Sequence, residues 1–418
     1  MEVTKQKKNY LTCTNRLRLS KNQFNLVSEL SYFSKNLYNA ALYETRQHYF
    51  QTDELLEYVD NYHRLKLNEN YQILPSQVAQ QTMKVVERTM KSYFGLLRER
   101  DKGNYNRPVG LPKYLPKSSK FILIFTKAHF KITNRKIKLT CNKELLKKYN
   151  LISLSFDFPK HLVGKEIKEV RINPRYKSFN IEYIYNDGKN YSKVNNSSNT
   201  LSIDLGLNNL IAMISNVNPQ PTLIDGREIK SKNRWVNKKL TRLQSIAKTV
   251  NHLDYTFSIN KLYQYRNNWI NNKFHHISNY IIEYCLSNNI SNIVIGYNQE
   301  WKQNINLGSQ NNQNFVQIPH GKLLGMIKYK AKNHEIAVEL QEESYTSKCD
   351  ALALEPIKKR DLYLGKRLKR GLFKSSTGRL INADINGALN ILRKCKGKAF
   401  VKELVNSGCV NQPVKIRI

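Results

Sequence analysis

Apolar residues recur at helical spacing in two long segments near the start of the chain. Over residues 24–50 they fall three and four positions apart, which places them on one face of a helix. A second such segment begins at Pro75-Ser76, a common helix start, and runs to Leu97. The pattern therefore predicts a helical region over residues 21–100.

Shorter apolar runs on both sides of this region predict strands. One weakly alternating run covers residues 9–18, and a turn-rich stretch after Arg100 is followed by FILIFT, HFKIT, RKIKLT, LISLSF, EIKEVRIN and FNIEYIYN. We expect a β-domain built from residues 1–20 and 101–190, with the helices of 21–100 inserted into it. This domain could close into a β-barrel that grips a nucleic-acid backbone, or it could be an ordinary antiparallel domain.

The polar segment of residues 186–200 lacks apolar periodicity and marks a domain boundary. Beyond it we expect three strands, two helices, a strand, a helix near Pro319, a strand and a last helix opened by Asp384. This order is that of an RNase H-like domain, a mixed sheet flanked by helices. The predicted fold class is α+β and multidomain, with this domain over 200–395 and a C-terminal tail over 396–418.

The charge balance indicates a nucleic-acid partner. The chain has 69 Lys and Arg residues against 32 Asp and Glu residues, a net charge of +37. Between Arg100 and Lys138, eleven basic residues and several aromatic residues accompany a single acid. A basic solvated surface is the alternative, but an excess of this size along the whole chain favours a polyanion.

Other features of the sequence argue against membrane and secreted classes. No run of 18 apolar residues occurs, and no apolar segment follows the first ten residues, so neither a membrane span nor a signal peptide is expected. The six cysteines have no CxxC spacing, which indicates reduced thiols. We therefore expect a cytoplasmic protein without a membrane partner.

Two acidic residues far apart in the sequence are candidates for metal chemistry. Asp204 ends a predicted strand, and Asp384 opens the last predicted helix. A lone Asp at a strand end commonly caps a turn, but two carboxylates from distant segments could share a divalent ion such as Mg²⁺ or Mn²⁺, as phosphodiester chemistry requires. Gly206, beside Asp204, would let a phosphate backbone approach closely.

Four motifs in this order, IDLGLNNL, IVIGYNQEWKQ, EESYTSK and INADINGALNI, resemble those of the TnpB proteins (the OrfB type) of bacterial insertion sequences. The resemblance implies a wedge-like β-barrel with an inserted helical recognition domain, followed by a RuvC-like nuclease domain. It also implies a guide RNA, a double-stranded DNA target and a place at the bacterial nucleoid. Asp204 and Asp384 match two of the metal ligands of that domain.

The third metal ligand of the family is missing from its usual strand. Gly296 stands where better-known members have a Glu. Glu343 is our preferred replacement, followed by Glu342 and then Glu300, because a spatially neighbouring acid can serve as well as a sequential one. If none of them serves, the protein would bind DNA without cutting it.

The zinc ribbon of the family is also missing. The interval 346–380 has Cys349 as its single cysteine, so we expect no structural zinc. A basic run fills the interval and predicts nucleic-acid contacts, although a mobile charged loop would show the same composition. The predicted contacts, which include a basic helix upstream, are Arg234, Lys238, Arg242, Thr346, Ser347, Lys366, Arg367, Lys369 and Arg370.

The leading hypothesis is an RNA-guided, Mg²⁺- or Mn²⁺-dependent DNA endonuclease of a transposable element. The sequence does not determine its guide RNA, its recognised DNA motif or its oligomeric state. The alternatives are a catalytically inactive RNA-guided DNA-binding regulator, kept open by Gly296, and a DNA-binding protein associated with a transposase.

Overall fold

The computed structural model describes the chain except for residues 1–9, 187, 189–190, 192, 194–196 and 298–316. Two compact units follow one another along the sequence, Met1–Lys189 and Asn190–Ile418. Their boundary falls in the polar segment that the sequence analysis marks as a boundary. In the described part of the chain, no helix is long and apolar enough to cross a membrane.

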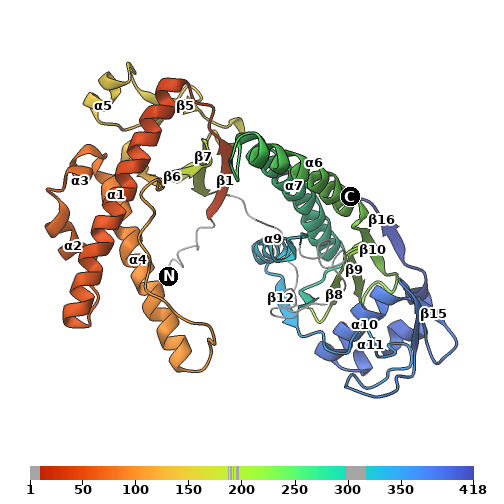
Figure 1. Ribbon diagram of the computed structural model, residues 1–418. Helices are drawn as coiled ribbons and strands as arrows, with labels where there is room; N and C mark the ends of the chain where they lie inside the picture. The colour runs from red at the N-terminus through yellow and green to blue at the C-terminus, as the bar shows by residue number, and fades with distance from the viewer. Residues whose placement is uncertain (1–9, 187, 189–190, 192, 194–196, 298–316) are drawn as a thin grey trace, which may run out of the picture. The chain divides into compact units, whose positions relative to one another are not determined.

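The first unit contains the predicted helical region (Figure 1). Its helices are α1 (Lys21–Thr52), α2 (Tyr58–Leu65), α3 (Glu69–Ile73) and α4 (Ser76–Asp101). Helix α1 begins at a capping box, in which the Ser20 hydroxyl accepts from the Gln23 backbone N–H and the Gln23 side chain accepts from the Ser20 N–H. The two long helices predicted by apolar spacing are therefore confirmed.

The strands of the first unit form two antiparallel sheets. One has the order β1 (Tyr10–Arg16), β7 (Ser178–Asn186), β6 (Glu166–Arg175), β2 (Leu123–Thr126), and the other the order β3 (Phe130–Thr133), β4 (Lys136–Leu139), β5 (Leu154–Asp157). Among the described residues no closed barrel is present, because β1 and β2 end the first sheet and β3 and β5 end the second. A short helix α5 (Lys143–Lys148) and two 3-10 turns, Lys127–His129 and Lys160–Leu162, complete the unit.

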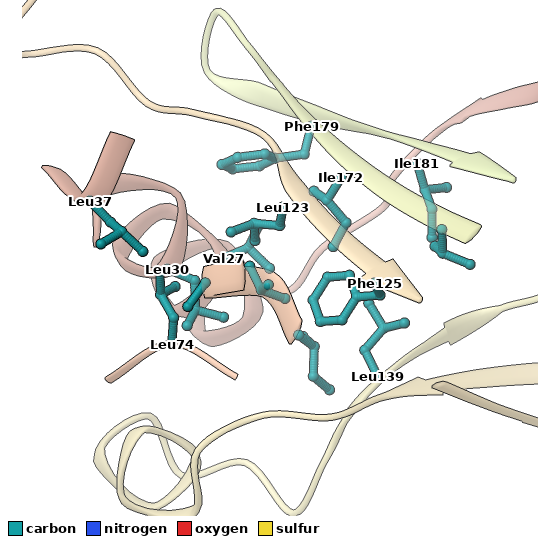
Figure 2. Packing of buried hydrophobic residues seen from close by; sticks show 14 of the residues in the cluster. Val27, Leu30, Leu37, Leu74, Leu123, Phe125, Leu139, Ile172, Phe179 and Ile181 are labelled. Carbon is teal, nitrogen blue, oxygen red and sulfur yellow. The ribbon is translucent and has the colours of Figure 1, made fainter. Parts of the chain in front are cut away.

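A single apolar core joins the helices of the first unit to its sheets. Figure 2 shows Val27 and Leu30 of α1 packed beside Leu123 and Phe125 of β2, and all four are fully buried. Phe179 of β7 belongs to the same core. The inserted helices are thus bound to the β-sheet by apolar burial, the main stabilising term in folding.

The second unit is built on a six-stranded mixed sheet. Its order is β12 (Ala337–Gln341), β11 (Asn292–Gly296), β8 (Thr200–Leu205), β9 (Asn209–Ser215), β10 (Thr222–Asp225), β16 (Val414–Ile416). The strands β8, β9 and β10 are antiparallel neighbours, whereas β11 runs parallel to β8 and β12 runs parallel to β11. The sheet is therefore mixed, as the sequence predicts for this domain.

Helices cover both faces of this sheet. One face packs against α6 (Arg227–Thr249), α7 (Phe257–Ser287) and α9 (His320–Asn333), and the other against α10 (Ala383–Lys396) and α11 (Ala399–Asn406). Residues on β8 alternate between the faces, with Leu201 and Ile203 in the core under α7. Ser202 and Asp204 alternate with these residues along the strand, so their side chains face α10.

The last part of the chain is integral to the second unit. Residues 396–418, predicted as a C-terminal tail, instead pack on this unit, since β16 pairs in parallel with β10 and Val401 of α11 is buried in the core. A small antiparallel sheet of β13 (Lys366–Lys369), β14 (Leu372–Lys374) and β15 (Leu380–Asn382) forms within the basic run. A 3-10 turn lies at Cys409–Asn411.

Candidate active site

Three parallel strands end side by side at one edge of the six-stranded sheet. Ile295 of β11 pairs with Ile203 of β8, and Gly296 pairs with Gln341 of β12. Asp204 follows Ile203, so it lies beside Gly296 at the carboxyl ends of the strands. In open α/β sheets this is the edge at which ligands bind.

Helix α10 lies close to Asp204 because glycine occupies the contact point. The Ser202 hydroxyl donates to the Ala388 carbonyl of α10 at 2.7 Å, which fixes the helix against β8. A Cβ added to Gly387 would lie 2.5 Å from Asp204 Oδ2. No side chain fits there, so Gly387 makes room for the carboxylate.

Gly296 makes room for Glu343 in the same way. A Cβ on Gly296 would lie 2.3 Å from Glu343 Oε1 and 2.5 Å from Ile391 Cδ1 of α10. The carboxylate of Glu343, two residues beyond the end of β12, therefore occupies the space that a side chain at position 296 would fill. The structure thus brings the preferred replacement acid to the strand end where an acid was missing.

The acids at this edge influence one another electrostatically. Burial raises the pKa of Asp204 well above its ordinary value, and the negative charges of Glu343 and Asp384 raise it further, while Arg367 acts in the opposite direction. Burial, with a contribution from Glu342, raises the pKa of Glu343 to about 7. Carboxylates gathered in this way favour a bound cation or a bound proton.

Asp384 is held at the first turn of α10. The Asn382 side chain caps the helix by accepting from the Asp384 and Ile385 N–H groups, and a carboxylate in the first turn interacts favourably with the helix dipole. Asn209 Nδ2 donates to Asp384 Oδ2 at 2.8 Å, and Arg367 Nη2 lies 3.9 Å from Oδ1. The carboxylate is therefore oriented from both sides.

A basic cavity of about 460 Å³ adjoins Asp384. Its lining includes four cationic side chains, which are Arg227, Arg367, Arg370 and Lys415. Cations beside an acidic site could neutralise the phosphates of a nucleic-acid strand brought to it.

A buried ladder of hydrogen bonds ties the segment after Glu343 to α10. Asn386 Nδ2 donates to the Cys349 carbonyl, and Asn390 Nδ2 donates to the carbonyls of both Thr346 and Cys349 at 2.8 and 2.7 Å. Arg393 continues the same face of the helix, donating to Asn390 Oδ1 at 2.6 Å. The ladder therefore connects the helix that carries Asp384 to the loop that carries Glu343.

The second candidate acid, Glu342, has a basic partner of its own. Glu342 is half-exposed and pairs with Lys394, whose hydrogen bond, together with those from Ser344, lowers the pKa of Glu342. Glu300 lies outside the described residues.

The predicted nucleic-acid contacts fall on several surfaces of the second unit. Thr346 is buried, and its hydroxyl donates to the Glu343 carbonyl at 2.8 Å, whereas Ser347 is exposed. The predicted basic contacts are all exposed. Helix α6 carries Arg234, Lys238 and Arg242, strand β13 carries Lys366, Arg367 and Lys369, and Arg370 lies in the turn after β13. Their contacts with nucleic acid remain predictions.

The interval without a zinc ribbon is held by a buried carboxylate. Asp350 is fully buried, and its Oδ2 accepts from the Ser375 hydroxyl and from both the hydroxyl and the backbone N–H of Ser376. Glu355, also buried, accepts from the Asp350 N–H. These bonds join the two segments on either side of the basic run.

The donor set fits a hard divalent cation, since it consists of carboxylates. In the arrangement described, no three His, Cys, Asp or Glu side chains among the described residues are grouped closely enough to hold one ion. Arg367 and Asn209 engage Asp384, and so compete with an ion for this carboxylate. The observation that favours a cation is the burial of Asp204 beside two like charges.

Sequence reasoning missed Gly387, whose role is visible only in three dimensions. Asn386 and Asn390 are recognisable in the sequence because they lie four apart on the helix of Asp384, but their partners are not. Gly206 was expected to admit a phosphate backbone. A Cβ there would instead lie 2.4 Å from the Asn209 carbonyl, so its glycine serves the turn between β8 and β9.

Comparisons with known proteins agree with the family resemblance seen in the sequence. The family model described as a probable transposase, OrfB_IS605, matches residues 178–302, and the Cas12f1-like TNB domain matches residues 320–391. A curated relative, the TnpB-like protein ORF457 of Acidianus two-tailed virus, is 25% identical over 427 residues, covering 92% of this chain and 87% of its own. The resemblance to the TnpB type is confirmed.

A solved structure shares the fold of this chain. The Cas12f1–sgRNA–target DNA complex, determined by cryo-EM, contains a chain that aligns with a TM-score of 0.59 and 16% identity, over 88% of this chain and 82% of that one. The match shows a mixed α/β multidomain fold of the same kind.

Proposed function

We propose that this TnpB-type protein is an RNA-guided DNA endonuclease of a transposable element. Its RuvC-like site would use Asp204, Asp384 and Glu343 to hold Mg²⁺ or Mn²⁺. The observation that carries the proposal is that Glu343 Oε1 fills the space left by Gly296, at the end of the strand next to Asp204. An acid is thereby supplied where the sequence lacks one.

The proposed partners are a guide RNA and a double-stranded DNA target. A net charge of +37 and a basic cavity beside Asp384 support a polyanionic partner on this chain. The solved relative is described as a complex with single-guide RNA and target DNA. In such proteins pairing reads the sequence, while the protein holds the duplex by its backbone.

The proposed division of labour follows the two units. Residues 1–20 and 101–190 would form the wedge-like β-domain, 21–100 the recognition helices, and 200–395 the RNase H-like nuclease domain with a degenerate ribbon at 346–380. The packing of α11 and β16 on the second unit extends that domain to the C-terminus of the chain.

The residues of the site can each perform a step that hydrolysis requires. A divalent cation, when bound, acidifies water and stabilises the charge that develops on the phosphate. Asp204 and Glu343 would provide carboxylate oxygens for the ion, and Asn209 orients the carboxylate of Asp384. Arg227, Arg370 and Lys415, which line the adjoining cavity, would neutralise the flanking phosphates.

A plasmid-cleavage assay tests the proposal. The protein, purified with the RNA that accompanies it, is mixed with Mg²⁺ and a plasmid matched to that RNA, and Asp204→Asn is compared with the exposed control Asp254→Asn. Asp254→Asn should cut like wild type, and Asp204→Asn should not cut but should still bind RNA. Cutting by Asp204→Asn would refute the assignment.

A non-catalytic guided DNA-binding protein is the competing function. The lack of three closely grouped ligands among the described side chains favours it. In the same assay this alternative predicts RNA-dependent plasmid binding by wild type without any cleavage.

A further inference from the structure

Arg367 brings a positive charge to the candidate active site. Its Nη2 atom lies 3.9 Å from Asp384 Oδ1. Its charge also reaches Asp204: burial, Glu343 and Asp384 raise the pKa of Asp204, and Arg367 acts in the opposite direction. One arginine therefore partly neutralises the same acids that are proposed to hold a divalent cation.

The contact between Arg367 and Asp384 is loose compared with that of another arginine in the same cavity. Arg227 donates to both carboxylate oxygens of Asp225, at distances from 2.7 to 3.1 Å, and Asp225 is nearly buried. The side chain of Arg367 is 47% exposed and stays 3.9 Å from its partner. Because an exposed ion pair of this kind is weak, Arg367 can leave Asp384 readily, whereas Arg227 is fixed.

The strand that carries Arg367 lies at the edge of a sheet. β13 is an outer strand of its three-stranded sheet, and all four of its residues are exposed. Its pairing with β14 is irregular between Arg367 and Lys369. Irregularities of this kind change the direction in which a side chain points. Arg367 therefore reaches Asp384 from an exposed strand, and its side chain has room to turn to another partner.

A phosphate in the cavity beside Asp384 would compete for Arg367. The cavity is lined by Arg367 together with three further cationic side chains. Guanidinium groups bind phosphate through two parallel, charge-assisted hydrogen bonds, so a phosphate there is a stronger partner than a carboxylate at 3.9 Å. Asn209 donates to the other oxygen of Asp384, Oδ2, and so still orients this carboxylate when Arg367 leaves Oδ1.

We propose that Arg367 is an internal counter-ion, which weakens the binding of a divalent cation until nucleic acid is bound. In the free protein its guanidinium partly neutralises Asp384. A phosphate in the cavity draws Arg367 away and leaves Asp384 Oδ1 available to the cation. Metal and nucleic acid then strengthen each other's binding by the same factor, as linkage requires. This inference rests on the proposed metal site and adds a control over when that site is filled.

Binding of Mn²⁺ to the free protein tests the first half of the proposal. The full-length chain is stripped of nucleic acid in high salt, and the EPR signal of unbound Mn²⁺ gives the affinity without any cleavage. Arg367→Gln should bind Mn²⁺ about fivefold more tightly than wild type, the effect of losing one exposed ion pair. In a variant that also carries Asp384→Asn, this gain should disappear, which assigns it to the contact between the two residues.

Two further variants separate this contact from general charge. Arg367→Lys keeps the positive charge at the same position and should bind Mn²⁺ like wild type. Lys374→Gln removes an equal charge from an exposed position on β14 of the same sheet, and should also bind like wild type.

A short single strand tests the second half of the proposal. Its phosphorothioate linkages resist hydrolysis, and Mn²⁺ binding by the strand alone is subtracted. Adding the strand should raise the Mn²⁺ affinity of wild type about fivefold more than that of Arg367→Gln, because this variant has no counter-ion left to displace.

Two results would overturn the proposal. One is equal Mn²⁺ affinity of free wild type and free Arg367→Gln, which would mean that Arg367 does not act on the metal site. The other is an equal gain in Mn²⁺ affinity when the strand is added to either protein. Both measurements are made without cleavage, so they leave the Asp204→Asn plasmid test unaffected, and the two proposals fail separately.

Discussion

At the scale of single residues, the central feature is that Glu343 supplies a carboxylate at the place where Gly296 lacks a side chain. The two positions belong to neighbouring strand ends, and the carboxylate of one occupies the side-chain space of the other. A metal responds to the position of an oxygen, whichever residue supplies it. The site could therefore be restored by moving the acid back.

A double variant tests whether an acid at position 296 can replace the acid at position 343. Glu343→Ala should lower the rate of cleavage by about 100-fold or more, a loss typical of removing a group that stabilises transition-state charge. Adding Gly296→Glu to Glu343→Ala should recover part of the rate, because the new side chain enters vacated space. Gly296→Glu alone should destabilise the fold by clashing with Glu343, which thermal unfolding would detect. If the double variant recovers none of the cleavage rate, an acid at position 296 cannot replace Glu343.

The pKa of Glu343 gives a prediction on stability without metal. Its ordinary pKa of 4.5 is raised by burial to about 7. Between these values the unfolded chain ionises while the folded protein retains the proton, so stability should fall as pH rises from 4.5 to 7. Glu343→Gln, which stays neutral, should gain in Tm over wild type across this window in chelator. If Tm changes with pH in the same way for the two proteins, the prediction is wrong.

Sequence reasoning identified Asp204 and Asp384 because each lies at a recognisable place, a strand end and a helix start. It preferred Glu343 but could not decide between this acid and Glu342, because both follow the same strand. The structure distinguishes the two acids by their neighbours, since Glu342 pairs with Lys394 whereas Glu343 lies at Gly296. Gly387 could not be identified because its role is defined by the distance to Asp204.

At the scale of elements, helix α10 organises the site. Its first turn carries Asp384, Gly387 gives Asp204 room, and its buried asparagines bind the loop that follows Glu343. The apolar spacing predicted this helix and most strands of the sheet. The small strands β13 to β15 were missed because three or four residues are too few for a periodic signal, and β13 is also mostly basic.

The asparagine ladder yields a prediction for α10. Asn390→Ala leaves the Thr346 carbonyl without this donor and Arg393 without this acceptor, while the Cys349 carbonyl keeps its bond from Asn386. The change should cost about 2 kcal/mol of folding free energy. Because the loop after Glu343 loosens, cleavage should also require a higher Mg²⁺ concentration for half-maximal rate. Asn61→Ala is the matched control, since buried Asn61 donates to the Ala41 carbonyl and the Thr45 hydroxyl in the first unit. An equal metal requirement in both variants would mean that Asn390 is only structural.

At the scale of the whole molecule, the proposed binding of nucleic acid would depend on charge. The excess of basic residues predicted a polyanion partner from composition alone. Composition could not predict the cavity beside Asp384, because Arg227 and Arg370 meet only after folding.

The salt dependence of binding follows from this charge. Replacing Arg234, Lys238 and Arg242 of α6 by Gln should weaken duplex binding without changing sequence preference. The slope of log affinity against log salt should become less steep by about 0.9 for each phosphate that the variant no longer neutralises. Anisotropy titrations at several salt concentrations measure this slope, and an unchanged slope would place α6 outside the nucleic-acid interface.

The most direct test of the account is cleavage by two neighbouring acid variants, measured side by side on a guide-matched plasmid with Mg²⁺. Glu343→Gln should lose cleavage while retaining RNA and DNA binding, because this carboxylate lies at Gly296, on the strand next to Asp204. Glu342→Gln should cut at close to the wild-type rate, because its partner is Lys394. Cleavage by Glu343→Gln at the wild-type rate, or its loss in Glu342→Gln alone, would contradict the proposed site.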